Sequence, residues 1–186
     1  MGFDVDQFVQ DCREALSEAT PQLAVRDVVE RAVRQPNEIE DALGVADGWR
    51  ATTLHNDADL TILHFIWPPT ADLFPHEHKM WSTVGIYGGI EDNTLYRKAG
   101  QALEVVGHKR GEVGDVVLMG AEAIHSVTNG SRQWTAALHV YGGDFFANPR
   151  LQWDKTTFQS KPYELANGRA ELMAAEERAR DQGIIT

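Results

Sequence analysis

The feature that most limits how this chain can fold is a series of short β-rich segments that begins after Trp49. Each segment is rich in β-branched and aromatic residues, and turn signals such as Gly88-Gly89 and Asn129-Gly130 separate them. Between the segments there is no helical pattern of the kind that connects parallel strands. The series therefore predicts an antiparallel barrel or jelly roll. Its clearest segments are 61–67, 82–87, 93–97, 103–108, 115–119, 125–128 and 135–141.

Helical patterns flank this β-rich part on both sides. Thr20-Pro21 is typical of a helix start near the N-terminus, and a helical pattern returns after Pro162. With 186 residues the chain is long enough for one domain with a substantial core, and too short to argue for two. We therefore expect a single domain over 1–186, with a helical part at 1–46, a β-barrel at 47–150 and a C-terminal extension with a helix at 151–186.

The charge of the chain limits its partners. A net charge of -11 argues against nucleic acids and anionic membranes, because their binding needs clustered Lys and Arg. The N-terminal residues lack the basic and apolar regions of a signal peptide, and the apolar runs are far shorter than a membrane span. A single cysteine, Cys12, fits a reducing compartment. We expect a cytoplasmic protein that acts on a small molecule, with no nucleic-acid or membrane partner.

The sequence His76-Glu77-His78 and the later His125 predict a metal site. Side chains alternate along a β-strand, so His76 and His78 would point to the same face. His125 on a neighbouring strand would complete a face of three imidazole nitrogens and leave coordination positions open. Neutral imidazoles suit Fe, Zn, Ni and Cu alike, so these ligands by themselves do not select the metal.

The residues around these histidines resemble the two sequence motifs of the cupin superfamily. Gly89 and Gly114 fall at motif positions, and Asn129 follows the third histidine at the expected spacing. The resemblance implies an all-β core with the cupin fold, a double-stranded β-helix or jelly-roll barrel. The place of the motif's acidic ligand falls on Ser82 or Thr83, so the metal set looks like three histidines without a carboxylate.

Within the cupins, the chain is similar to the cysteine dioxygenase-like branch, in particular to bacterial 3-mercaptopropionate dioxygenase-like proteins. The segment 78–91 (HKMWSTVGIYGGIE) matches the pattern after the paired histidines in that branch, and 138–143 (LHVYGG) resembles the segment that carries its outer-sphere residues. Members bind Fe(II) through three histidines and add both atoms of O2 to a small thiol, which gives a sulfinate. The resemblance thus implies Fe(II), or another divalent transition metal, as cofactor and O2 as a reactant.

The resemblance also gives His139 and Tyr141 an outer-sphere catalytic role. In the family a serine, a histidine and a tyrosine form a hydrogen-bonded triad, and the place of the serine falls on Ala137. His139 would lack that hydroxyl partner, which is worth roughly 0.5–1.5 kcal/mol. The alternatives are a core histidine bonded to a backbone carbonyl and a tyrosine that only lines the barrel.

Candidates for substrate binding come from the strand ends near the barrel. Arg50 and Arg97 are the arginines closest to such ends, and a planar guanidinium suits bidentate binding of a carboxylate. The alternative for both is a solvated charge. Trp81 is expected to pack against the barrel wall beside the metal and to influence the shape of the substrate pocket. Glu91 matches a family position but lies too far beyond the paired histidines to be a good metal ligand.

Three functions are compatible with these residues. The first is an Fe(II)-dependent thiol dioxygenase-like enzyme that oxidises a small thiol carboxylate to its sulfinate. The second is a cupin metalloenzyme that acts on a non-thiol small molecule. Ala137 favours this alternative, because it stands at the place of the triad serine. The third is a non-catalytic cupin that binds a ligand through its metal. The substrate and the oligomeric state stay open at this level.

Overall fold

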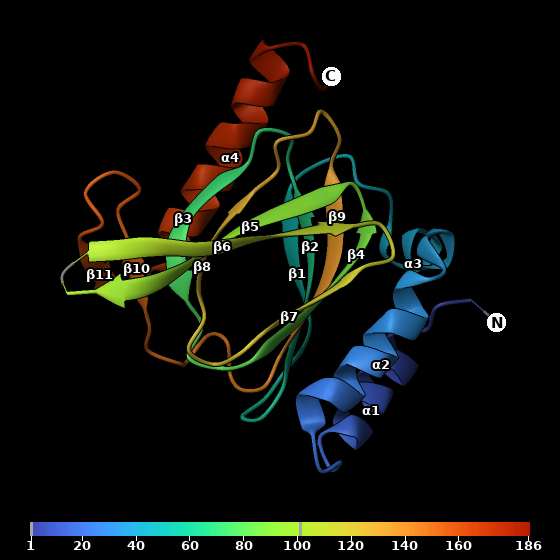
Figure 1. Ribbon diagram of the computed structural model, residues 1–186. Coiled ribbons are helices and arrows are strands. Elements are labelled where there is room, and N and C mark those ends of the chain that lie inside the picture. The colour runs from blue at the N-terminus through green and yellow to red at the C-terminus, as the bar shows by residue number, and fades with distance from the viewer. Residues whose placement is uncertain (1, 101) are drawn as a thin grey trace.

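The computed structural model describes residues 2–100 and 102–186. Figure 1 shows a β-barrel with helices beside it at the N-terminal (blue) and C-terminal (red) ends of the chain, as expected. None of the helices in the described part combines the length and the apolar composition that a membrane span requires. The helices are α1 (Val5–Ala15), α2 (Pro21–Val33), α3 (Pro36–Leu43) and α4 (Leu165–Asp181). The strands are β1 (Arg50–Asn56), β2 (Thr61–Trp67), β3 (Asp72–Glu77), β4 (Ser82–Gly88), β5 (Ile90–Ala99), β6 (Ala102–Glu112), β7 (Val116–Met119), β8 (Ile124–Thr128), β9 (Thr135–Tyr141), β10 (Leu151–Trp153) and β11 (Ser160–Pro162).

The strands form two antiparallel sheets. One sheet has the order β1-β2-β9-β4-β7 and the other the order β11-β10-β3-β8-β5-β6. Between β2 and β9 the chain alternates from one sheet to the other. Without the added strands β1, β10 and β11, the two sheets have the orders β2-β9-β4-β7 and β3-β8-β5-β6. This is the strand order of the jelly roll, the double-stranded β-helix of cupins. The predicted fold class is confirmed.

The segment after the barrel contributes strands as well as the expected helix. β10 pairs with β3, where Gln152 lies opposite His76, and β11 pairs with β10. These strands extend the barrel sheet into the part that the sequence analysis treated as an extension. Strands of three residues are too short to give a recognisable alternation of apolar and polar side chains, which is why the sequence did not reveal them.

Helices α1 and α2 cover the outer face of the sheet that contains β9 and β4 (Figure 1). The side chain of Asp4 accepts a hydrogen bond from the backbone N–H of Gln7 at 2.8 Å, which caps the start of α1. Gly85 of β4 lets α2 approach closely, because a Cβ there would lie 2.7 Å from Val33 Cγ1 and closer still to Val29 Cγ1. This contact fixes the helices on the face of the barrel opposite to its interior.

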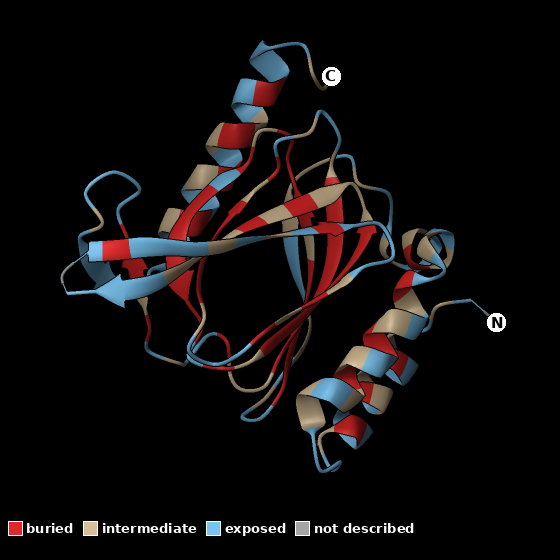
Figure 2. Ribbon diagram, in the orientation of Figure 1, coloured by how far each residue is buried: buried red, intermediate tan, exposed pale blue. Residues whose placement is uncertain are grey.

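Alternation along β9 divides the buried residues into two groups. Leu138 and Val140 pack with the helices. Ala137, His139 and Tyr141 point the other way, into the barrel. Figure 2 shows strands such as β4 and β9 as buried (red), whereas β1 and β6 are exposed along much of their length. The barrel interior therefore holds polar side chains that are shielded from water.

Candidate metal centre

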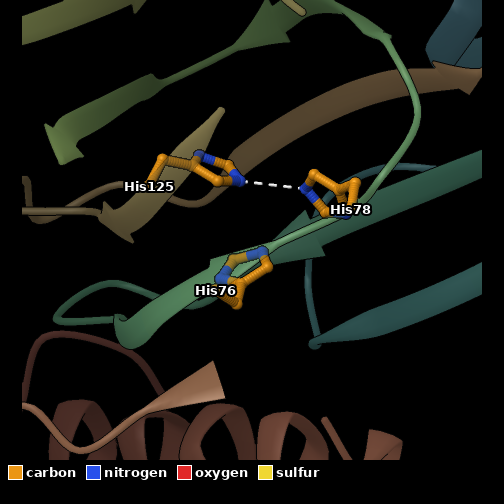
Figure 3. A group of neighbouring side chains, drawn as sticks. All are labelled: His76, His78 and His125. Atoms are coloured by element: carbon orange, nitrogen blue, oxygen red, sulfur yellow. Dashed lines mark hydrogen bonds between the residues drawn. The ribbon is translucent and has the colours of Figure 1, made fainter. Parts of the chain in front are cut away.

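His76, His78 and His125 meet inside the barrel. His76 lies near the end of β3, His78 comes directly after that strand, and His125 lies on β8 directly opposite His76. A ring nitrogen from each of them lies within 4.8 Å of the others. Figure 3 shows the three rings converging from these neighbouring segments. The structure thus brings together the three histidines that the sequence predicts as metal ligands.

Hydrogen bonds at the Nδ1 atoms orient two of the rings. His76 Nδ1 donates to the backbone carbonyl of Phe74 at 3.0 Å, and His125 Nδ1 donates to Oδ1 of Asn93 at 2.7 Å. Both bonds leave Nε2 with its lone pair, and they are of the kind that orients metal-binding histidines. Nε2 of His78 lies 2.9 Å from Nε2 of His125, as the dashed line in Figure 3 marks. Two ring nitrogens at this distance need a proton or a cation near them.

Burial keeps the three imidazoles neutral. Desolvation lowers the pKa of His76 to about 4, and it lowers the pKa values of His78 and His125 well below 6.5. At neutral pH each ring therefore has a lone pair for a metal. Among the described residues, the cluster consists of histidines without a carboxylate, which agrees with Ser82 or Thr83 at the motif's acidic position. The donor set fits a divalent transition metal with open coordination positions.

The histidines line a cavity of about 450 Å³ inside the barrel. Much of its wall is apolar, including the aromatic rings of Trp49, Phe65 and Phe145. Leu172 and other residues of α4 also line it, so the C-terminal helix covers part of the cavity. A cavity of this size with few polar groups is typical of a site for a small organic molecule.

His139 and Tyr141 line the same cavity. His139 Nδ1 and the Tyr141 hydroxyl lie 3.1 Å apart, which is a hydrogen-bond distance. The Tyr141 ring lies 5.0 Å from the ring of His78, so the pair is next to the metal cluster. Burial lowers the pKa of His139 to about 3 and raises the pKa of Tyr141, so both side chains are neutral at physiological pH.

Ala137 packs with apolar neighbours such as Val84 and Met119. A different group approaches His139 instead. The carboxyl of Glu91 is 1% exposed, and its Oε2 lies 3.6 Å from His139 Nε2. Glu91 lies outside the histidine cluster. Its position beside His139 could not be predicted from periodicity, because the two residues lie on different strands, β5 and β9.

The substrate-binding candidates from the sequence lie outside the cavity wall. Arg97 is exposed, and its Nη2 lies 2.9 Å from Oε2 of Glu104 on β6. Arg50 forms an ion pair with Asp47 at 3.0 Å. Trp81 is half-buried and packs with the cluster under α1 and α2 rather than in the cavity. The structure therefore does not bring these three residues together with the histidines.

A buried arginine that the sequence analysis did not single out lies next to the cavity. The guanidinium of Arg150 stacks on the rings of Phe145 and Tyr163, 4.2 Å from each centroid. Its Nε and Nη2 are buried without a hydrogen-bond partner among the described residues. After burial, its charge is a further cause of the low pKa of His76 and His78. Arg150 lies between β9 and β10, where no periodic pattern marks it.

About half of the chain is similar in fold to solved structures. No family model matches the sequence, and no curated protein matches it either. The chain is similar to a protein with a double-stranded β-helix domain from Klebsiella pneumoniae, with 11% identity and a TM-score of 0.42 over 52% of this chain and 74% of that one. It is similar to a cupin domain from Schizosaccharomyces pombe, with 12% identity and a TM-score of 0.43 over 53% and 63%.

An oxalate decarboxylase from Bacillus subtilis is also similar to this chain, with 16% identity and a TM-score of 0.43. The match covers 55% of this chain and 27% of the decarboxylase, so the chain spans about a quarter of that protein. These likenesses are too low to bear on function. The fold therefore rests on the strand pairing itself, and the function has to be argued from the site.

Proposed function

We propose that the chain is an Fe(II)-dependent dioxygenase of the thiol dioxygenase type. The observation that supports this most is the presence, in one cavity wall, of the three-histidine cluster and of the His139–Tyr141 pair. A bound Fe(II) would supply open coordination positions at which a thiolate and O2 react. The thiol would lose its proton and its sulfur would gain both atoms of O2, so forming the sulfinate needs no external reductant.

The protein side chains would orient the reactants and keep out water. The hydroxyl of Tyr141 stays protonated because burial raises its pKa. It can donate a hydrogen bond into the cavity when it accepts the proton of His139 Nδ1. A fixed donor in a dry site stabilises developing negative charge without having to reorganise. The apolar wall around Phe65 and Phe145 would exclude water from the reacting thiolate.

A carboxylate on the substrate would meet positive charge at this site. Arg169 of α4 lines the cavity, and among the described residues no other arginine or lysine does so. Arg150 lies behind the rings of Phe145 and Tyr163 with two unpartnered nitrogens. We therefore prefer Arg150 and Arg169 as the groups that attract a substrate anion, because Arg97 is paired at the surface and does not line this wall.

Oxygen consumption tests this proposal. Protein reconstituted with Fe(II) should consume O2 in the presence of 3-mercaptopropionate, and faster than with cysteine. The product should be a sulfinate, heavier than the thiol by two oxygen atoms in mass spectrometry. His125→Ala is the control, because it removes one ligand from the cluster. Uptake that stays at the level of free iron across short thiols would rule out thiol dioxygenation.

A metalloenzyme for a larger, non-thiol molecule is the second candidate. A three-carbon thiol acid would fill only part of the cavity of about 450 Å³, and Ala137 removes the family's serine. O2 uptake over a panel of apolar carboxylic acids without a thiol would identify such a substrate. Acids that bind without any O2 uptake would instead indicate a non-catalytic, metal-dependent binding protein.

A further inference from the structure

A chain of polar contacts links the outer-sphere pair to a metal-ligand candidate. It starts at the Tyr141 hydroxyl, 3.1 Å from His139 Nδ1, and continues on the other side of that ring, where Nε2 lies 3.6 Å from Glu91 Oε2. The second carboxyl oxygen of Glu91 accepts a hydrogen bond from Asn93 Nδ2 at 3.0 Å. Oδ1 of Asn93 accepts from His125 Nδ1 at 2.7 Å. Every group in the chain is buried.

The direction of these hydrogen bonds follows from the metal site. His125 can offer Nε2 to a metal only if its proton is on Nδ1, and that proton points to Oδ1 of Asn93. The amide group of Asn93 must then turn its N–H toward Glu91 Oε1. Oε2 of Glu91 is left facing His139 Nε2, and each of these two atoms is buried without another partner in the described part of the chain.

A buried carboxyl in this position calls for an explanation. Unpaired polar atoms are rare in protein interiors because they lose their hydrogen bonds to water. Oε2 of Glu91 and Nε2 of His139 satisfy each other if one proton lies between them, and a small shift would shorten their 3.6 Å separation to a hydrogen bond. Ala137 offers no competing hydroxyl from β9, so the carboxyl is the partner available to this side of the ring.

We propose that Glu91 is a positioning residue that fixes the ring of His139, and through it the Tyr141 hydroxyl, in place of the missing serine. The same carboxyl also holds Asn93, which orients His125. One side chain thus sets the geometry of the outer-sphere pair and of a metal ligand together. The consequence for catalysis rests on the proposed function, but the effect on the His139 ring can be measured without any turnover.

The imidazole nitrogens of His139 report on this role in NMR spectra of the protein, first metal-free and then with diamagnetic Zn(II). His139→Gln identifies the signals. The wild-type ring should have a single tautomer. In Glu91→Met, which keeps the length of the side chain but lacks the carboxyl, the nitrogen signals should move toward the average of two tautomers. Metal affinity should fall roughly 10-fold, at the low end of effects from residues behind metal ligands.

Glu91→Gln gives a sharper expectation. Its Oε1 must face the N–H of Asn93, so its amide N–H would donate to His139 Nε2 and force the ring proton onto Nδ1. A proton on Nε2 in this variant would overturn the proposal, and so would wild-type nitrogen signals in Glu91→Met. The Gln variant decides the question by itself if the Met variant fails to fold.

A hydroxyl restored on β9 provides a test by rescue. Ala137→Ser combined with Glu91→Met should return His139 to one tautomer, because the serine lies two residues from His139 on the same strand face. Rescue would support the proposal that the carboxyl of Glu91 positions His139 as a serine hydroxyl at position 137 would. A double variant whose signals remain averaged would overturn it. Absence of thiol turnover in the wild-type protein, with these spectra as expected, would count against the proposed function alone.

Discussion

Each of the three clustered histidines offers one nitrogen, so removing any one of them should abolish stable metal binding. We expect the purified protein to carry about one transition metal ion per chain, and His76→Ala, His78→Ala or His125→Ala to lose it. Changes behind a ligand already lower affinity by about 10–100-fold, and the loss of a ligand should do more. Metal analysis after dialysis measures this, with the exposed His108→Ala as control. Full metal retention in all three cluster variants would contradict the site.

Tyr141 offers a test of the outer-sphere pair. Tyr141→Phe removes the hydroxyl that lies 3.1 Å from His139 Nδ1 and leaves the ring in place. If the hydroxyl acts on the reactants, kcat should fall, by up to about 10²–10⁴-fold, while metal content stays unchanged. Ala137→Ser adds a hydroxyl with little extra volume, and we expect unchanged or higher activity on thiols. Full activity of Tyr141→Phe on its substrate would make the pair structural.

At the scale of elements, the contact between α2 and β4 depends on a glycine. Gly85→Ala would place a Cβ against Val29 and Val33, which belong to the fully buried core. Overpacking of this kind typically costs about 1–3 kcal/mol. Gly107→Ala on β6 is the matched control, because a Cβ there would have no neighbour within 4 Å among the described residues. Urea unfolding should show a lower free energy of unfolding for Gly85→Ala only; equal stability of both variants would contradict this packing.

The sequence predicted the elements better than the contacts between them. Short segments rich in β-branched and aromatic residues, with turn signals between them, were sufficient for the barrel, and the spacing of His76, His78 and His125 was sufficient for the cluster. The contacts of Asn93 and Arg150 could not be predicted in the same way. Asn93 reaches His125 only because of the register between β5 and β8, and Arg150 depends on the path of a loop. β5 and β8 are not joined by a turn that would set their register, and the path of a loop does not follow from periodicity.

For the whole molecule, the buried histidines make the metal-free fold sensitive to acid. The pKa of His76 and of His64 is lowered to about 4 by burial, below the value of about 6.5 expected for the unfolded chain. The unfolded state therefore takes up protons first as the pH falls, and stability is lost from about pH 6.5 toward pH 4. Glu91 opposes this in part, because burial raises its pKa to about 7 and the folded state binds that proton first.

Thermal unfolding of the metal-free protein between pH 7.5 and pH 4.5 measures the net effect of the buried histidines and of Glu91 on stability. We expect Tm to decrease with acid, because buried histidines outnumber the one carboxyl with a strongly raised pKa among the described residues. His64→Gln replaces a histidine that bonds to Tyr87 away from the cluster, and it should reduce the acid sensitivity without touching the metal ligands. A Tm that does not change over this range would contradict the burial of neutral imidazoles.

The metal should stabilise the entire barrel, because its ligands come from β3, the residue after it and β8, which pair only in the folded sheet. A ligand that binds only the folded state at 100 times its Kd adds about 2.7 kcal/mol. For a domain of this size, that corresponds to a rise in Tm of roughly 5–10 °C. Titration of the metal-free protein with Zn(II) or, without oxygen, Fe(II) should give this shift in differential scanning calorimetry. His108→Ala should retain the shift and His125→Ala should lose it. A shift of the same size in His125→Ala would mean that the metal acts at another place on the molecule.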